Sequence, residues 1–245
     1  MTPPHLLVVQ HEDDCTPSWF GQWFLEAGVT YDVVLGHRGA PVPGELGSYD
    51  GLVVLGGEMG AYDDDANPWL TPTKRLIAHT VADHGCFLGI CLGHQLAAVA
   101  LGGQVEVNPL GRAAGLTSVR LTPEGEQDPL LGIVASGARA VQWNDDVVTR
   151  LPAGAVQLAT SPDGSIQAAR FGPRAWGVQF HPETSPAVFA SWVKVVDPEA
   201  AGFDSELHAA SEGISAAGDE LQQSWRPFAS RFAALVSEQR ALSMS

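Results

Sequence analysis

Basic residues and long apolar stretches are scarce in this sequence. It has 245 residues, of which 13 are Lys or Arg and 28 are Asp or Glu, so the formal net charge is −15. Proteins that grip nucleic acid carry a clustered basic face, and the few basic residues here are scattered. The longest apolar run, residues 96–101, is far shorter than the ~20 residues that cross a bilayer. We therefore expect no nucleic-acid partner and no membrane partner.

Cysteine is scarce too, because the chain holds only Cys15, Cys86 and Cys91. Three thiols cannot all pair with one another, and this density is far below that of a disulfide-stabilised scaffold. Residues 1–5 show no basic stretch ahead of an apolar segment, so no secretory signal is visible. The hydrophobic fraction of 45% suffices for a sizeable core. These features predict a cytoplasmic globular protein with free thiols.

The first hundred residues alternate between strand-like and helix-like segments. Compact apolar or β-branched runs predict strands at residues 5–10, 29–35, 50–55 and 86–90. Apolar residues at helical spacing, or runs rich in Ala and Leu, predict helices at residues 16–27, 68–84 and 92–101. This alternation is typical of an α/β protein with a mostly parallel central sheet that is covered by helices on both faces.

The texture changes between residues 104 and 180, where short β-like pieces are separated by Gly, Pro and Asp. The candidate strands are residues 119–121, 140–143, 155–159, 166–170 and 176–180. Short strands with tight connections favour antiparallel pairing. We expect this part to extend the sheet in a more antiparallel manner.

A third kind of composition begins at residue 197, with much Ala, Ser and Glu. Its apolar residues recur at gaps of three, four and seven, as in amphipathic helices; they are Phe203, Leu207, Ile214, Leu221, Trp225, Phe228, Phe232 and Leu235. Pro227 interrupts the run, so we expect a second helix to start near it. We predict a domain at residues 1–196 and a helical extension at 197–245. The extension either caps the domain or binds a partner or a second copy of the chain.

The strongest chemical signal is Cys91, which has Gly89 and Gly93 two residues to either side. This spacing, between a predicted strand and a predicted helix, is typical of a nucleophile on a sharp turn. The start of the helix favours a thiolate there, and the amide of Leu92 points toward a forming oxyanion. Most free cysteines are small buried apolar residues, but this context favours a nucleophile.

A thiol nucleophile needs a base, and the base needs a group to orient it. His181 ends the apolar segment 176–180, and Glu183 follows two residues later. Residues i and i+2 of an extended segment share a face, so the carboxylate is in reach of the imidazole. Such a pair would hold the tautomer and stabilise the imidazolium.

Two metal-binding interpretations have less support than the nucleophile interpretation. Cys86, Cys91 and His94 could be taken as zinc ligands, but Cys86 and Cys91 lie at opposite ends of one strand and no suitable fourth ligand is evident. The acidic run at residues 63–65 is more simply a solvated loop than a cation site. We expect neither a metal nor a cofactor.

Three segments in this order resemble the class I, or triad, glutamine amidotransferases. They are Gly56-Gly57 after a strand, residues 88–95 around Cys91, and residues 179–183 around His181. The resemblance runs from about residue 5 to residue 196 and implies the flavodoxin-like fold of that family. It also implies that glutamine is the substrate and that Cys91 forms a γ-glutamyl thioester, which is then hydrolysed to glutamate as ammonia leaves.

The same resemblance implies a role for each matched residue. His181 is the general acid and base, and Glu183 orients it. The backbone amides of Gly57 and Leu92 form the oxyanion hole, and Gln95 shapes the glutamine pocket. His94, one helical turn from Cys91, has no catalytic role.

The sequence looks most like free-standing members related to the glutaminase domain of GMP synthetase. Many relatives have Trp-His-Gly-Asp where this chain has residues 143–146, and many have proline where it has Glu58. Three functions stay open. The first is a glutaminase that supplies ammonia to a separate synthetase or acceptor. The second is a stand-alone γ-glutamyl hydrolase or peptidase, and the third is a non-catalytic interaction protein.

Overall fold

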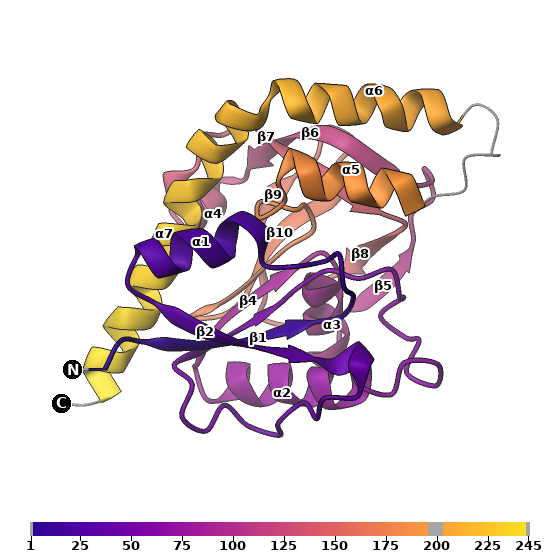
Figure 1. Ribbon diagram of the computed structural model, residues 1–245. Coiled ribbons are helices and arrows are strands. Elements are labelled where there is room, and N and C mark those ends of the chain that lie inside the picture. Colours follow the sequence, from indigo (N-terminus) through magenta and orange to yellow (C-terminus); the bar gives the residue numbers. More distant parts are fainter. Residues whose placement is uncertain (1, 196–202, 244–245) are drawn as a thin grey trace.

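The computed structural model describes residues 2–195 and 203–243, which fold around a nine-stranded sheet (Figure 1). In spatial order its strands are β2 (Thr30–Leu35), β1 (His5–Gln10), β3 (Gly51–Val54), β4 (Cys86–Ile90), β11 (Ala175–Val178), β10 (Ile166–Gly172), β9 (Val156–Thr160), β6 (Ala113–Leu121) and β7 (Ala138–Asn144). A separate antiparallel pair consists of β5 (Gln104–Val107) and β8 (Asp146–Arg150).

The sheet is parallel in one half and antiparallel in the other. Strands β1, β2, β3 and β4 pair in parallel, whereas β10, β9, β6 and β7 pair in antiparallel fashion. This confirms the α/β class and the antiparallel extension. The strand predicted at residues 176–180 joins the two halves: β11 pairs antiparallel with β10, as expected, but parallel with β4, and it ends at Val178. A single short apolar strand carries no local signal of which neighbour it will join.

Helices cover both faces of the sheet. The three helices of the first hundred residues lie where the apolar spacing predicts them, as α1 (Ser18–Glu26), α2 (Leu70–Ala82) and α3 (Leu92–Ala100). Leu6 and Val8 of β1 belong to the core beneath α1, while Leu7 and Val9 belong to the core beneath α2 and α3. Alternate residues of a strand point to opposite faces, so β1 is buried on both sides.

Within the described residues, six further helical elements follow the strands or lie C-terminal to them. They are the single-turn helices η1 (Gly36–Arg38) and η2 (Leu131–Ile133), and the helices α4 (Pro123–Glu126), α5 (Pro186–Val195), α6 (Phe203–Ala216) and α7 (Gly218–Ser243). In the described residues, no helix combines the length and apolarity that a membrane crossing requires.

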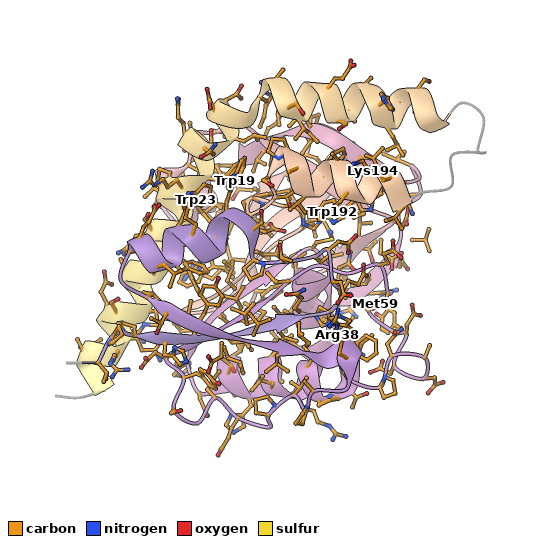
Figure 2. All side chains as sticks on the ribbon, in the orientation of Figure 1. Trp19, Trp23, Arg38, Met59, Trp192 and Lys194 are labelled. Atoms are coloured by element: carbon orange, nitrogen blue, oxygen red, sulfur yellow. The ribbon has the colours of Figure 1, made fainter. Side chains whose placement is uncertain are left out.

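The two C-terminal helices pack on the rest of the chain. Helix α7 runs along α1 (Figure 1), where Phe228 lies 6.1 Å from Phe20 and Phe232 lies 6.1 Å from Phe24, centroid to centroid. The stacked rings of Trp19 and Trp23 belong to the same helix α1 (Figure 2). Of the predicted apolar positions, those from Leu207 onward are buried, which confirms the helical spacing. The Phe203 side chain and the predicted boundary at 196/197 lie outside the described residues, so the two-part division stays a prediction.

The expected helix break at Pro227 was wrong, because α7 continues through it and the break falls at Ala217. Proline lacks the N–H that would bond the carbonyl of Gln223. Both residues are on the exposed face of α7, where water can serve that carbonyl. The buried side chains of Trp225 and Phe228 hold the helix on either side.

Replacing Phe232 with alanine tests how far α7 stabilises the domain. The ring is fully buried, so we expect Phe232→Ala to lower the free energy of unfolding by about 3–5 kcal/mol. Urea titration of the purified chain measures this. The control, Gln222→Ala on the exposed face of α7, should change it by less than about 0.5 kcal/mol. Equal effects of the two changes would contradict the packing described.

Candidate active site

Cys91 occupies the one-residue turn between β4 and α3. Its backbone has φ 50° and ψ −105°, a region that non-glycine residues rarely adopt and that costs on the order of 1–3 kcal/mol. A Cβ atom on Gly93 would lie 2.1 Å from the carbonyl oxygen of Val54, and one on Gly89 would lie 2.5 Å from the Gly93 oxygen. The turn is therefore possible only with glycine at both flanking positions.

Two polar groups hold the sulfur of Cys91. The thiol donates to the carbonyl oxygen of Trp143 at 3.6 Å, and the side-chain amide of Gln179 donates to the sulfur at 3.6 Å. The sulfur also lies at the start of α3, where the helix dipole favours negative charge. The side chain is 5% exposed. These contacts fix the direction in which the sulfur points.

His181 and Glu183 form a buried pair beside Cys91. The Nδ1 atom of His181 lies 2.8 Å from Oε1 of Glu183, and the Thr184 hydroxyl donates to the same oxygen at 3.2 Å. Among the described residues, Nε2 of His181 has no hydrogen-bond partner. A Cβ atom on Gly56 would lie 2.9 Å from Cε1 of His181 and 3.6 Å from Cβ of Cys91. Gly56 thus leaves open the space that the two side chains share.

The charge state of His181 follows from its neighbours. Burial disfavours the imidazolium, but the Glu183 carboxylate and the Cys91 sulfur outweigh that effect and raise the pKa of His181 to about 10. The imidazole ring also packs edge-on against Trp192, with centroids 4.8 Å apart. A buried imidazole that stays protonated at neutral pH can deliver a proton to a leaving group.

Two cavities meet at Cys91. The larger holds about 400 Å³ and has several polar walls, lined among others by Gly57, Glu58, Gln95, Arg112, Asn144, Asp145 and Asp146. The Gln95 amide donates to the Asp146 carbonyl at 2.9 Å, and the Arg112 guanidinium bonds both carboxylate oxygens of Asp145. The predicted residues Gly57 and Gln95 therefore do line a cavity at the nucleophile.

Leu92 presents only its backbone amide to the space at Cys91. Its side chain is buried in the core beneath α2 and α3. Within the described part of the chain, the amides of Gly57 and Leu92 donate to no other group. Both are thus available to a ligand oxygen at Cys91.

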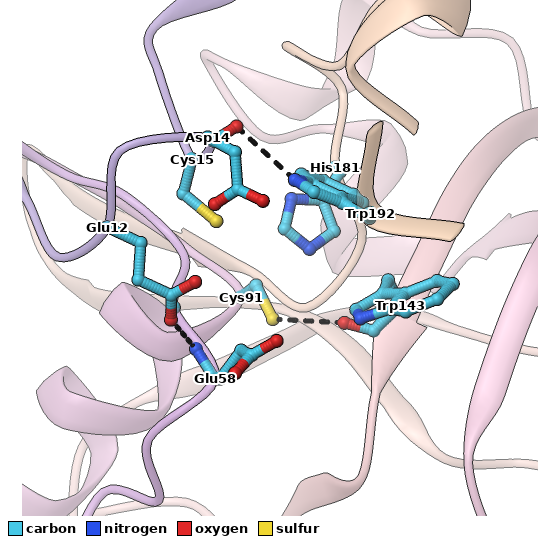
Figure 3. Close-up of a pocket in the computed structure, with 9 residues that line it drawn as sticks. Glu12, Asp14, Cys15, Glu58, Cys91, Trp143, His181 and Trp192 are labelled. Atoms are coloured by element: carbon cyan, nitrogen blue, oxygen red, sulfur yellow. Dashed lines mark hydrogen bonds between the residues drawn. The ribbon is translucent and has the colours of Figure 1, made fainter. Parts of the chain in front are cut away.

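The smaller cavity holds about 30 Å³ and is lined mostly by residues that the sequence did not single out (Figure 3). Glu12, Asp14 and Cys15 come from the loop after β1, and Trp192 comes from α5. No local spacing relates these residues to Cys91. Glu12, Asp14 and Cys15 had one available signal, their position after the carboxyl end of a predicted parallel strand. Trp192 had none.

The residues of the weaker zinc interpretation, Cys86, Cys91 and His94, do not form a cluster of possible metal ligands among the described residues. His94 is fully buried against Phe171, with ring centroids 5.5 Å apart, and burial lowers its pKa to about 3. Cys86 starts β4 and Cys91 follows its end. The acidic run 63–65 has loop contacts instead: Asp63 accepts from the Gly60 amide, and Asp64 pairs with Lys74 at 2.6 Å.

The family model described as glutamine amidotransferase class-I matches residues 22–193 of this chain. The chain belongs to the class-I glutamine amidotransferase family. A solved glutamine amidotransferase from Thermotoga maritima has the same fold, with a TM-score of 0.84 and 25% identity over 95% of this chain and 99% of its own. This class-I fold agrees with the sheet and helices described above.

Two curated relatives of this amidotransferase carry different names. One subunit of the glutamine-hydrolyzing GMP synthase of Halobacterium salinarum is 31% identical over 199 residues, which is 79% of this chain and 99% of the relative. A γ-glutamyl-L-1-hydroxyisopropylamide hydrolase from a Pseudomonas species is 32% identical over 146 residues, or 57% of this chain. The match spans about half the length of that hydrolase, at 49%.

The glycine requirement at the turn is testable with two matched changes. Gly93→Ala forces a Cβ into the Val54 carbonyl, so we expect a loss of several kcal/mol in stability or a chain that fails to fold. Gly213→Ala, also within a helix but with open space around it, should stabilise by up to about 1 kcal/mol. Thermal unfolding of both variants checks the opposite signs. A well-folded, fully active Gly93→Ala variant would contradict the close approach.

Proposed function

We propose that this class-I amidotransferase cleaves the side-chain amide of glutamine through a γ-glutamyl thioester on Cys91. One observation carries the proposal: a strained, oriented thiol and the buried imidazole of His181, which is paired with Glu183, line a common cavity. A nucleophile, a proton donor and its orienting carboxylate are the parts that acyl transfer requires.

The reaction has two steps, formation of the thioester and its hydrolysis. The Cys91 thiolate attacks the side-chain amide carbon (Cδ) of glutamine, the carbonyl oxygen becomes an oxyanion, and the amides of Gly57 and Leu92 bind it. The C–N bond then breaks as Nε2 of His181 gives its proton to the nitrogen, which leaves as ammonia. In the second step water attacks the thioester, His181 takes its proton, the C–S bond breaks and glutamate is released.

The larger cavity suits the amino-acid end of the substrate. Asp146 presents a carboxylate whose pKa is raised by burial and by its neighbours Asp145 and Asp63. The Arg112–Asp145 pair lies in the same wall, with the guanidinium 5.3 Å from the Trp143 ring centroid. A wall with charges of both signs complements a zwitterion, so we place the α-ammonium of glutamine at Asp146. Gln95 completes this pocket.

The ammonia goes to a separate acceptor or synthetase. A relative named as a subunit of GMP synthase favours this destination. The C-terminal helices are the proposed surface for such a partner or for self-association. The predicted apolar side chains from Leu207 to Leu235 are buried against the rest of the chain, which supports the cap interpretation for that face.

Stand-alone hydrolysis of γ-glutamyl amides is the second candidate function. It uses the same thioester and differs only in the amine that leaves. Three carboxylates on the smaller cavity, from Glu12, Asp14 and Glu58, favour it, because they would hold a leaving amine as a cation. The relative from Pseudomonas, whose name states hydrolysis of a γ-glutamyl amide, points the same way.

Covalent trapping tests the proposed nucleophile. Purified wild type and Cys91→Ala are mixed with a diazo-ketone analogue of glutamine and measured by intact-protein mass spectrometry. We expect one adduct on the wild type and none on the variant, with glutamate released from plain glutamine by the wild type alone. Glutamate release at equal rates by both proteins would overturn the thioester mechanism.

The His181–Glu183 pair makes a pH-dependent prediction. The raised pKa of His181 keeps the imidazolium present through neutral pH. Glu183→Gln removes the carboxylate, so the pKa should fall toward its usual ~6.5 and the proton donor should be lost at lower pH. We expect kcat to drop about 100-fold and the basic limb of its pH profile to move to lower pH. An unmoved limb would argue against this role for Glu183.

A further inference from the structure

The smaller cavity adjoins the amino-acid pocket at Cys91. Both cavities include Cys91, Gly57, Glu58 and Trp143. Only the larger one includes Gln95 and Asp146, and only the smaller one includes Glu12, Asp14 and His181. A γ-glutamyl group in the larger cavity presents its scissile C–N bond at Cys91. The leaving amine is then directed to the smaller cavity, which also contains His181.

The walls of the smaller cavity are acidic. Glu12, Asp14 and Glu58 line it, and no lysine or arginine does so among the described residues (Figure 3). Glu12 accepts a hydrogen bond from the backbone amide of Glu58, which ties two of the three acids together. Burial raises the pKa of Glu12 to about 6 against the opposing effect of that bond, so a cation beside it would be stabilising.

The other walls are indole rings. Trp192 is 6% exposed, and its indole N–H donates to the Asp14 carbonyl at 3.3 Å. Trp143 packs edge-on to Phe189 nearby, with centroids 5.4 Å apart. The two tryptophans give the cavity an apolar wall, while the three carboxylates complement a cation and disfavour an anion.

A buried polar atom independently points to a ligand in this space. His181 is 3% exposed, lines the cavity, and leaves Nε2 without a hydrogen-bond partner in the described structure. The cavity volume of about 30 Å³ has room for about two water-sized groups. That is enough for the amine nitrogen and its first carbon, while a longer tail would extend past Glu58, which is exposed at the mouth.

We propose that the smaller cavity is the leaving-amine subsite and that it selects γ-glutamyl amides whose amine carries a second, positively charged group, as a diamine does. This inference rests on the γ-glutamyl transfer proposed above. The leaving nitrogen receives its proton from His181 as the C–N bond breaks. The distal ammonium lies outside the cavity beside the exposed Glu58, keeps its charge, and is attracted from there by Glu12 and Asp14 as well.

Three synthetic γ-glutamyl amides of matched length test the selection. Their amines are 1,4-diaminobutane, n-butylamine and 4-aminobutanoate, which carry a cationic, a neutral and an anionic tail. The measurement is kcat/KM for glutamate release by the full chain. We expect the order cationic, neutral, anionic, with a cationic-to-anionic ratio of about 100 that falls in high salt.

Glu12→Gln and Glu58→Gln should each lower that ratio about tenfold, because each removes one charge and keeps the side-chain shape. The matched control is Glu45→Gln, an exposed residue ahead of β3 near the end of α2; it removes the same charge elsewhere and should leave the ratio unchanged. Glu58 is exposed, so its variant reports on the site even if Glu12→Gln folds poorly.

The outcomes separate this inference from the proposed function. Cleavage of all three amides at similar rates, a preference for the anionic tail, or ratios untouched by both substitutions would overturn the amine subsite alone. No cleavage of any amide or of glutamine, together with no adduct on Cys91, would overturn the γ-glutamyl chemistry itself.

Discussion

The backbone contact between Gly93 and the carbonyl of Val54 fixes the geometry on which the site depends. Because α3 approaches β3 this closely, the chain must reverse within a single residue after β4, and Cys91 takes the positive φ that results. The sulfur therefore lies at the carboxyl edge of the sheet. The neighbouring parallel strands end at the same edge, so the loops that follow them lie close to the sulfur.

Each functional group arrives from a different strand of the parallel half. Glu12 and Asp14 follow β1, Gly57 and Glu58 follow β3, and His181 follows β11. The antiparallel half contributes the opposite wall, because Trp143 and Asn144 end β7. The backbone amide of His181 donates to the Val141 carbonyl at 2.7 Å, which ties the two halves together directly beside the nucleophile.

The two cavities at Cys91 differ in charge, and this difference bears on which amide is cleaved. In the proposed function the larger cavity offers charges of both signs to the amino-acid end of the substrate, through Asp146 and the Arg112–Asp145 pair. The smaller cavity adds Glu12, Asp14 and Trp192 to the shared Glu58 and Trp143, and we propose that it receives the amine. The carboxylates of the smaller cavity are the feature that favours the second proposed function, hydrolysis of γ-glutamyl amides.

Residues close together in the chain were enough to predict the local parts of this protein. These parts are the strand–turn–helix around Cys91, the helical spacing of the C-terminal segment and the reach of Glu183 to His181. Long-range packing was needed to establish that β11 lies parallel to β4 and so carries His181 to Cys91, 90 positions earlier in the chain. Long-range packing was also needed to establish that α7 continues past Pro227 and that Glu12, Asp14 and Trp192 line one cavity. The periodicity of a segment shows which face of a helix or strand is apolar, but not which other element packs against that face. Strand partners and cavity walls depend on that packing, so only the tertiary structure determines them.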